Sequence, residues 1–264
     1  MRQRLPPPLR IGDVSAEGIL LAGGARAILL QLANPGVGHG VADHSNFAHR
    51  PLDRLHGTLT YLYVIVYGTP EESRRVAKMV GTAHAAVRSA PGGPVPYDAR
   101  DDTLQLWVAA TLYDTSMRIR ELVYGPLEPA DAQSLLADYS VIATALGVPR
   151  AMWPADSAAF AQYWSTAERA LRVDDVARGV ARELLHPSTG PWWLRTAMPT
   201  VRLLTAGLLS PELRGAYDLP FDERRYRRLV RLARALYPRL PQWIRCAPKR
   251  RYLSAFRKRT AVEL

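Results

Sequence analysis

The sequence predicts an all-α protein folded as one domain, and three observations support this fold class. The 264 residues are 48% hydrophobic and 22% charged, which is ordinary for a globular domain with one large core. The apolar residues form segments that are longer than typical strands. Prolines and glycines lie between these segments as start and stop signals, without a regular series of strands or a fixed-period repeat.

The first two predicted helices flank a region rich in histidine. Residues 19–33 are apolar nearly all round, which predicts a buried helix. The Asn-Pro-Gly sequence at 34–36 should end this helix, because the residue before a proline disfavours helical geometry. A short region with three histidines follows at 39–49. Pro51 then suits the first position of a second helix, predicted over 52–67.

The start of the next helix carries the clearest local signals. Thr69 can cap it, Pro70 fits its first position, and two glutamates occupy its first turn. The helix is predicted over 70–89, and the Pro-Gly-Gly-Pro sequence at 91–94 follows its end. The remaining helices are predicted over residues 103–123, 129–146, 154–171, 173–185, 192–208 with an interruption at Pro199, and 223–237, where Leu229, Leu232 and Leu236 form the apolar stripe.

Composition excludes several classes of protein. Cys246 is the only cysteine, so neither an internal disulfide nor a cysteine-based zinc site is possible. No segment reaches the roughly 18 apolar residues of a membrane span, and the N-terminus lacks the apolar run of a signal peptide. We therefore expect a cytoplasmic protein whose single domain spans residues 1–264.

Positive charge is concentrated near the C-terminus, in a basic segment at 221–264. The chain carries a formal charge of +11, and residues 221–259 contain 14 Lys and Arg against 2 Asp and Glu. The simplest expectation is a solvated amphipathic helix followed by a basic tail. Contact with an anionic membrane, with cofactor carboxylates or with nucleic acid is the alternative. The arginines alternate with leucine and proline and form no helix-turn-helix, so we expect no nucleic acid partner and favour peripheral membrane contact.

The sequence lacks the usual catalytic motifs, including a phosphate-binding loop, a GxSxG elbow and an HExxH zinc motif. His39, His44 and His49 are spaced by five residues, which puts them on different faces of a helix. Ordinary surface or core histidines are therefore expected there. His44, between Asp43 and Ser45, is the one with the strongest case for a functional role.

His84 is the best-placed residue for chemistry. The residues around it, Gly81, Thr82, Ala83 and Ala85, are small enough to admit a flat, bulky group close to the helix. A buried histidine needs a partner for each ring nitrogen, and haem iron can be one of them. Arg88, one helical turn later, can pair with a haem propionate. A core histidine that only completes hydrogen bonds fits the same pattern, so both interpretations stay open.

Arg54 and Thr58 on the preceding helix are four residues apart and share a face. A guanidinium and a hydroxyl in this arrangement can hydrogen-bond an oxygen species near iron. An arginine in an ordinary ion pair is the alternative.

Taken together, several segments are similar to the haem-dependent oxygenase family that contains MpaB-type oxygenases and the latex-clearing protein, a rubber oxygenase. The similarity covers nearly the whole chain. Its segments are residues 30–35, 43–47, 54–58, 67–68, 84–88, 97–99, 106–112, 146–149 and 203–211.

This resemblance implies an all-helical bundle enclosing haem b. His84 takes the position of the proximal iron ligand, and Arg54 and Thr58 take the positions of the distal pair; His44 and Arg88 are further cofactor-binding candidates. Three residues depart from the family pattern. Gly57 replaces a lysine that can reach the iron, and Asn34 and Ala109 stand where many relatives have histidine.

The function expected from the resemblance is haem-dependent oxygenation of a small or medium apolar substrate, with O₂ on the side opposite His84. A haem-binding protein or sensor without oxygenase activity is the first alternative, supported by the three departures. A helical module that binds an anionic membrane or nucleic acid through its basic C-terminal segment is the second.

Overall fold

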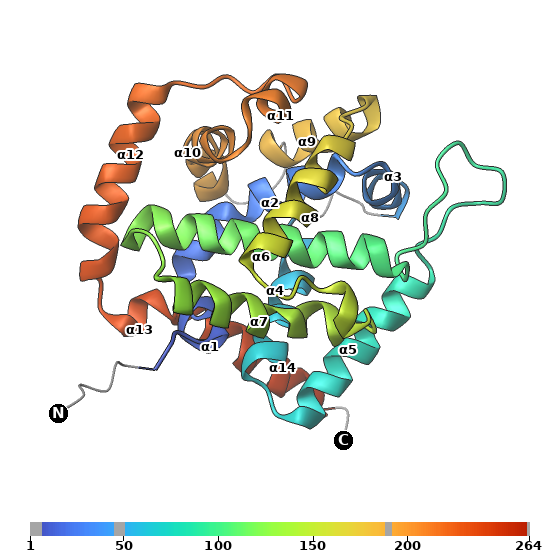
Figure 1. The fold of residues 1–264 in the computed structure, drawn as a ribbon, viewed down its shortest axis with the longest axis horizontal. Coiled ribbons are helices and arrows are strands. Elements are labelled where there is room, and N and C mark those ends of the chain that lie inside the picture. Colours follow the sequence, from blue (N-terminus) through green and yellow to red (C-terminus); the bar gives the residue numbers. More distant parts are fainter. Residues whose placement is uncertain (1–6, 45–50, 188–191, 263–264) are drawn as a thin grey trace.

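The computed structural model describes residues 7–44, 51–187 and 192–262, and helices dominate this part of the chain (Figure 1). It contains no strand, only an isolated antiparallel bridge between Arg88 and Asp98. The predicted all-α fold class is therefore confirmed. The first half contains α1 (Ile11–Ser15), the 3₁₀ turn η1 (Gly18–Gly23), α2 (Gly24–Leu32), α3 (Pro35–His44), α4 (Pro51–Tyr67), α5 (Pro70–Ala85) and α6 (Asp102–Tyr124).

The second half begins with α7 (Pro129–Thr144). The helices that follow are η2 (Arg150–Met152), α8 (Ser157–Ala170), α9 (Asp175–Leu185), α10 (Trp192–Leu208), α11 (Pro211–Ala216), α12 (Glu223–Leu236), η3 (Tyr237–Arg239), α13 (Gln242–Arg245) and α14 (Ala247–Val262). No helix in the described ranges is both long and apolar enough to cross a membrane.

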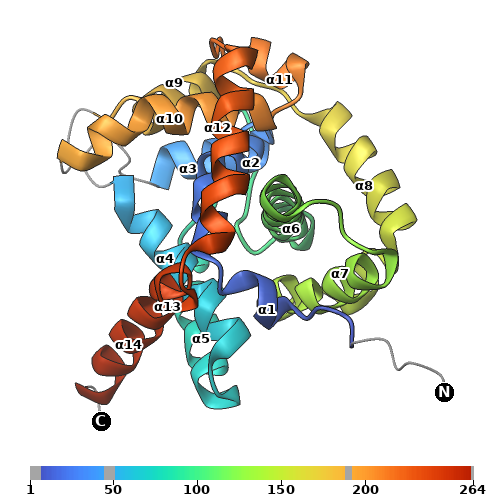
Figure 2. The same cartoon turned by 90° about the vertical axis from the view of Figure 1, so that its left-hand side faces the viewer.

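Helix α6 runs through the middle of the molecule, and the other helices surround it (Figures 1 and 2). It packs against α2, η1, α7 and α12. On one side, α4 packs against α5, α7 and α14, and α3 packs against α2 and α9. The fully buried side chains include Leu29 and Leu30 on α2, Val64 on α4 and Leu135 on α7. The indole of Trp107 on α6 donates to the Leu30 carbonyl at 3.2 Å, which satisfies its buried N–H group.

The start of α5 follows from its sequence as predicted. The hydroxyl of Thr69 accepts from the Glu72 amide at 3.2 Å, and the Glu72 carboxylate accepts from the Thr69 amide at 2.8 Å. This reciprocal pair satisfies two amides that have no partner inside the helix. The carboxylate of Asp101 caps α6 in a similar way, by accepting from the amides of residues 103 and 104.

One predicted helix end was wrong, and one helix start was missed. The first helix ends as predicted, with α2 finishing at Leu32, but Pro35 then begins α3, which the Asn34 side chain caps by accepting from the Val37 amide at 3.3 Å. Helix α5 ends at Ala85 instead of residue 89. The amide of Ser89 pairs with the Tyr97 carbonyl and the amide of Ala99 with the Val87 carbonyl, so residues 86–101 form a short paired loop.

Two further expectations need correction. Pro199 lies inside α10 without interrupting it. The C-terminal stretch is not a tail, because α14 packs on α4 and buries Phe256, whose exposed fraction is 1%. Arg257 on α14 also forms an ion pair with Glu72 on α5, with Nε and Oε1 2.7 Å apart. Most of the basic segment therefore belongs to the folded body.

Candidate functional site

A cavity of about 350 Å³ lies among α3, α4, α5 and α6, beside the loop at 86–101. This volume is within the usual range for a site that holds a small organic ligand or cofactor. Its lining is mostly apolar and includes Val37, Val41, Val80, Leu104, Val108 and Leu112. The lining residues His44, Gly57 and Ala83 are exposed, so the cavity opens to solvent beside them.

His84 lines this cavity from the last turn of α5. Its ring is partly buried, and its Nδ1 atom is fully covered. Ala83 and Ala85, on either side of His84, have small side chains, so little protrudes from the helix next to the imidazole. The structure therefore puts the histidine singled out in the sequence on the wall of an apolar cavity.

Thr58 and Gly57 line the same cavity from α4. A Cβ atom added at Gly57 would meet nothing within 4 Å, so the backbone there borders open space. The side chain of Arg54, the other member of the predicted distal pair, lies outside the described part of the structure. Its backbone is in the first turn of α4, one turn before Thr58.

His44 reaches the cavity from the C-terminal end of α3, near its opening. Its ring lies edge-on to Tyr97, with 6.0 Å between ring centroids. The Tyr97 hydroxyl donates to Asp43 at 2.6 Å, and burial together with this carboxylate raises the pKa of Tyr97 to about 12. His39, by contrast, faces α9 and pairs with Asp174, with Nε2 and Oδ2 2.9 Å apart.

Arg88 does not lie where the sequence placed it. The helix ends three residues earlier, so Arg88 belongs to the loop and does not share a helical face with His84. Its side chain is exposed and is not part of the cavity lining, and its backbone pairs with Asp98. The correction concerns this geometry, and a role of Arg88 toward a cofactor remains a prediction.

Gln105 on α6 is a lining residue that sequence reasoning missed. Its exposed fraction is 8%, and its Nε2 group donates to the Ala99 carbonyl at 2.9 Å. That bond fixes the amide orientation, and the other end of the amide, Oε1, is buried without a hydrogen-bond partner among the described residues. A buried acceptor without a partner is costly and rare, which makes Gln105 a candidate contact for a bound group.

A second, smaller pocket of about 100 Å³ adjoins the cavity. The two spaces share the lining residues Gln31, Thr58, Leu112 and Ile142. The other lining residues include leucine and isoleucine side chains of η1, α2 and α4. Thr58 therefore lies at the border between the main cavity, which contains His84, and the smaller apolar pocket, which we call the annex.

Within the described ranges, no three His, Cys, Asp or Glu residues are grouped so that they could hold a metal ion by themselves. The donor set at the cavity is two histidines, His84 and His44, with neutral polar groups and apolar walls. Fold and site together thus define an all-helical protein with a histidine-bearing apolar cavity.

Sequence comparison identifies the family. The profile of the family described as "ER-bound oxygenase mpaB/B'/Rubber oxygenase, catalytic domain" matches residues 13–235, which include every cavity residue discussed above. The chain belongs to this family of oxygenase catalytic domains. It is also 38% identical over 225 residues to uncharacterized proteins of Mycobacterium bovis and Mycobacterium tuberculosis, covering 81% of this chain and 88% of each relative. No solved structure matches the chain.

Proposed function

We propose that this protein is a haem b-dependent oxygenase that acts on a small apolar substrate. The observation that carries the proposal is the position of His84 on an apolar cavity whose lining includes Thr58. The match of residues 13–235 to a family of oxygenase catalytic domains also supports the proposal.

The residues at the cavity fit a haem better than a bare metal ion. A porphyrin brings four nitrogen ligands of its own, so the protein needs to supply only one axial histidine. Apolar walls suit the porphyrin faces. Gln105 Oε1 would accept from a donor on the substrate, because a metallated porphyrin with ionised propionates has no hydrogen-bond donor of its own. When bound, haem supplies an iron centre at which O₂ can be activated.

In this proposal the residues at the cavity have three separate roles. His84 would hold the iron through a ring nitrogen, and the apolar walls would surround the porphyrin. Thr58, with Arg54 one turn earlier, would supply hydrogen-bond donors on the α4 side of the cavity, where they would help to bind and orient O₂. His44 lies at the opening, Tyr97 lines the cavity, and Arg88 directly follows the lining residue Val87 in the loop; these residues would be the candidates to meet the haem propionates.

The annex beside Thr58 indicates a substrate with a compact apolar part. We propose that this part enters the second pocket while the reacting carbon stays near Thr58. Ala27→Leu would fill the annex without touching the main cavity, because Ala27 lines only the smaller space. We expect a lower kcat/KM for the bulkier members of a substrate series and an unchanged haem spectrum. An equal effect on all substrates would contradict this assignment.

The central experiment is a UV-visible spectrum of the purified protein after haem supplementation, oxidised and reduced, with and without CO. The wild type should show a Soret band that shifts with CO, and His84→Ala should lose or greatly alter it. His56→Ala is the matched control, because His56 is exposed on α4 and does not line the cavity. Absence of a Soret band in the wild type, or an unchanged spectrum in His84→Ala, would overturn the proposal.

A haem protein without oxygenase activity is the second candidate. The Asn34 amide is engaged in capping α3, and Ala109 presents no polar atom to the cavity. Neither can replace a histidine in proton transfer. Oxygen consumption with a panel of apolar substrates separates the two candidates, since a sensor would bind haem without consuming O₂.

A further inference from the structure

An exposed apolar ridge runs from the end of α12 to α13. It consists of Leu232, Leu236, Leu240, Trp243 and Ile244, all of them exposed within the described part of the molecule. The exposed fractions of Leu232, Leu236 and Trp243 are 56%, 55% and 66%. Helix α12 lies on the outside of the molecule and continues into α13 at its lower end (Figures 1 and 2).

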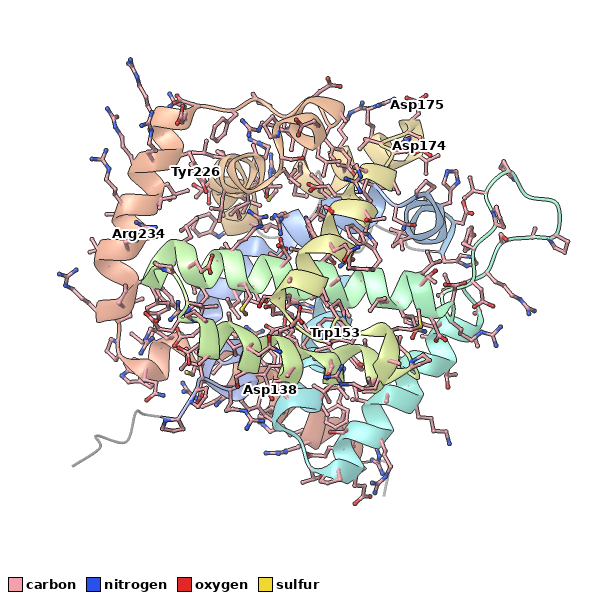
Figure 3. The ribbon with its side chains drawn as sticks, viewed as in Figure 1. Asp138, Trp153, Asp174, Asp175, Tyr226 and Arg234 are labelled. Carbon is pink, nitrogen blue, oxygen red and sulfur yellow. The ribbon has the colours of Figure 1, made fainter. Side chains whose placement is uncertain are left out.

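The ridge is not the face of α12 that packs on the protein. Tyr226 points from α12 toward α10 (Figure 3), where its ring occupies the space above Gly207. Val230 and Ala233 continue this inward face at helical spacing and are partly buried. The sequence predicted one stripe of Leu229, Leu232 and Leu236, but only Leu229 is partly buried. Leu232 and Leu236, four residues apart, lie on the outward face.

Positive charge surrounds the ridge. Residues 224–262 contain no Asp or Glu. Arg225 and Arg228 share the outward face of α12 with Leu232, and Arg239 lies between the leucines of the ridge. Arg228 and Arg239 form no ion pair within the described ranges. The surface thus combines exposed aliphatic and indole side chains with guanidinium groups, of which Arg225 pairs with Asp222 and Arg239 donates to the Ala235 carbonyl.

We propose that this ridge docks the protein onto the surface of an anionic membrane. An interfacial helix places leucine and tryptophan side chains at the headgroup boundary while arginines contact anionic headgroups. A second copy of the chain would bring the same positive charges together, which opposes self-association. Nucleic acid would engage the arginines but leave the apolar ridge without a partner. The ridge lies at the end of the family match and beyond it, so it adds to the proposed function without depending on it.

The test is flotation of the full-length protein with vesicles of phosphatidylcholine alone and vesicles that also contain phosphatidylserine. The wild type should bind only the anionic vesicles, and binding should weaken with salt. The double variant Leu236→Ser/Trp243→Ser should bind at least about tenfold more weakly, since burial of a single large apolar side chain is worth that much. The double variant Arg228→Gln/Arg239→Gln should also bind the anionic vesicles more weakly than the wild type.

Met79→Ser is the matched control, because Met79 is an exposed apolar residue on α5, away from the ridge. It should bind like the wild type. No binding of the wild type to anionic vesicles at low salt, or an equal loss in Met79→Ser, would overturn the proposal. A change from dimer to monomer in the ridge variants would assign the surface to a second copy instead. Salt-sensitive binding to DNA without vesicle binding would assign it to nucleic acid.

Discussion

Gly57 is the residue at which this chain departs most directly from the pattern of the latex-clearing protein. It borders the cavity next to Thr58, and a side chain there would enter open space. In the proposed haem-bound protein, we predict that Gly57→Lys is tolerated and supplies an amine that competes for the iron. The haem spectrum should change toward a six-coordinate, low-spin form. If the amine-bound state dominates by about tenfold, the apparent affinity for CO falls by a similar factor.

Gly81→Lys is the control for this substitution. Gly81 is exposed on α5, a Cβ there also meets nothing within 4 Å, and the residue does not line the cavity. Its spectrum and CO affinity should match those of the wild type. An identical response of the two lysine variants would show that the residue at 57 does not reach the haem site.

Some of the residues that line the cavity could be singled out from the sequence, and their roles there stay predictions. His84, Thr58 and His44 come from three different helices, and the structure brings them to one cavity. Arg88 was misplaced because its position depends on pairing between the Val87–Ser89 and Tyr97–Ala99 backbones, which no local pattern reveals. Gln105 was missed because a glutamine within a helix is an ordinary surface residue in sequence terms. Its distinguishing feature, a buried acceptor without a partner, exists only in the folded chain.

At the scale of single elements, α2 is joined to α6 by a buried charge. Arg26, 3% exposed, pairs with Asp114, with Nη2 and Oδ2 2.7 Å apart. It also donates to the Thr115 hydroxyl at 2.7 Å and to the Leu208 carbonyl at 2.8 Å. We predict that Arg26→Met lowers the free energy of unfolding by roughly 3 kcal/mol or more, because a buried hydroxyl and two partly buried acceptors lose their donor.

Arg118→Met provides the comparison, since Arg118 contacts the same carboxylate at 2.8 Å from a half-exposed position. That variant should lose less than about 1 kcal/mol. Urea unfolding followed by circular dichroism measures both values. Similar losses in the two variants would mean that the burial of Arg26 adds nothing to the pair.

The loop at 86–101 should respond to acid. The side chain of Arg100, followed by its backbone amide, hydrogen-bonds Asp98 and lowers the pKa of this carboxyl to about 2 from an ordinary 3.8. A depressed pKa stabilises the folded loop above the ordinary value, and this contribution is lost as the pH falls from about 4 toward 2. An NMR titration of Asp98 should report the low value, and Arg100→Gln should return it toward the ordinary one. A titration near 3.8 in the wild type would contradict this.

Helix starts were more predictable than helix ends. The first residues of α4, α5 and α7 are the prolines that the sequence indicated, since capping depends on a few adjacent residues. The early end of α5 depends on a distant loop partner, and Pro199 is tolerated inside α10. Helix α14 was missed because its many basic side chains obscure the residues that anchor it, the buried Phe256 and the partly buried Leu253.

At the scale of the whole molecule, the contacts of α14 predict that the C-terminal segment unfolds together with the family domain. Phe256 lies in the core, and Arg257 forms an ion pair with Glu72 on α5, the helix that carries His84. We predict one cooperative unfolding transition, coincident by far-UV circular dichroism and tryptophan fluorescence. Phe256→Ala should shift the whole transition and cost about 3–5 kcal/mol, because a large buried side chain leaves a cavity.

Arg259→Ala tests whether this cost comes from the core contact. Arg259 is exposed on the same helix, so its removal should change the stability by no more than about 0.5 kcal/mol. Two separate transitions, with Phe256→Ala affecting only the weaker one, would instead make α14 an independent appendage. A single shifted transition would mean that the ridge at α12 and α13 unfolds in the same cooperative unit as His84. The reason is that α14, which follows the ridge in the chain, would then belong to that unit.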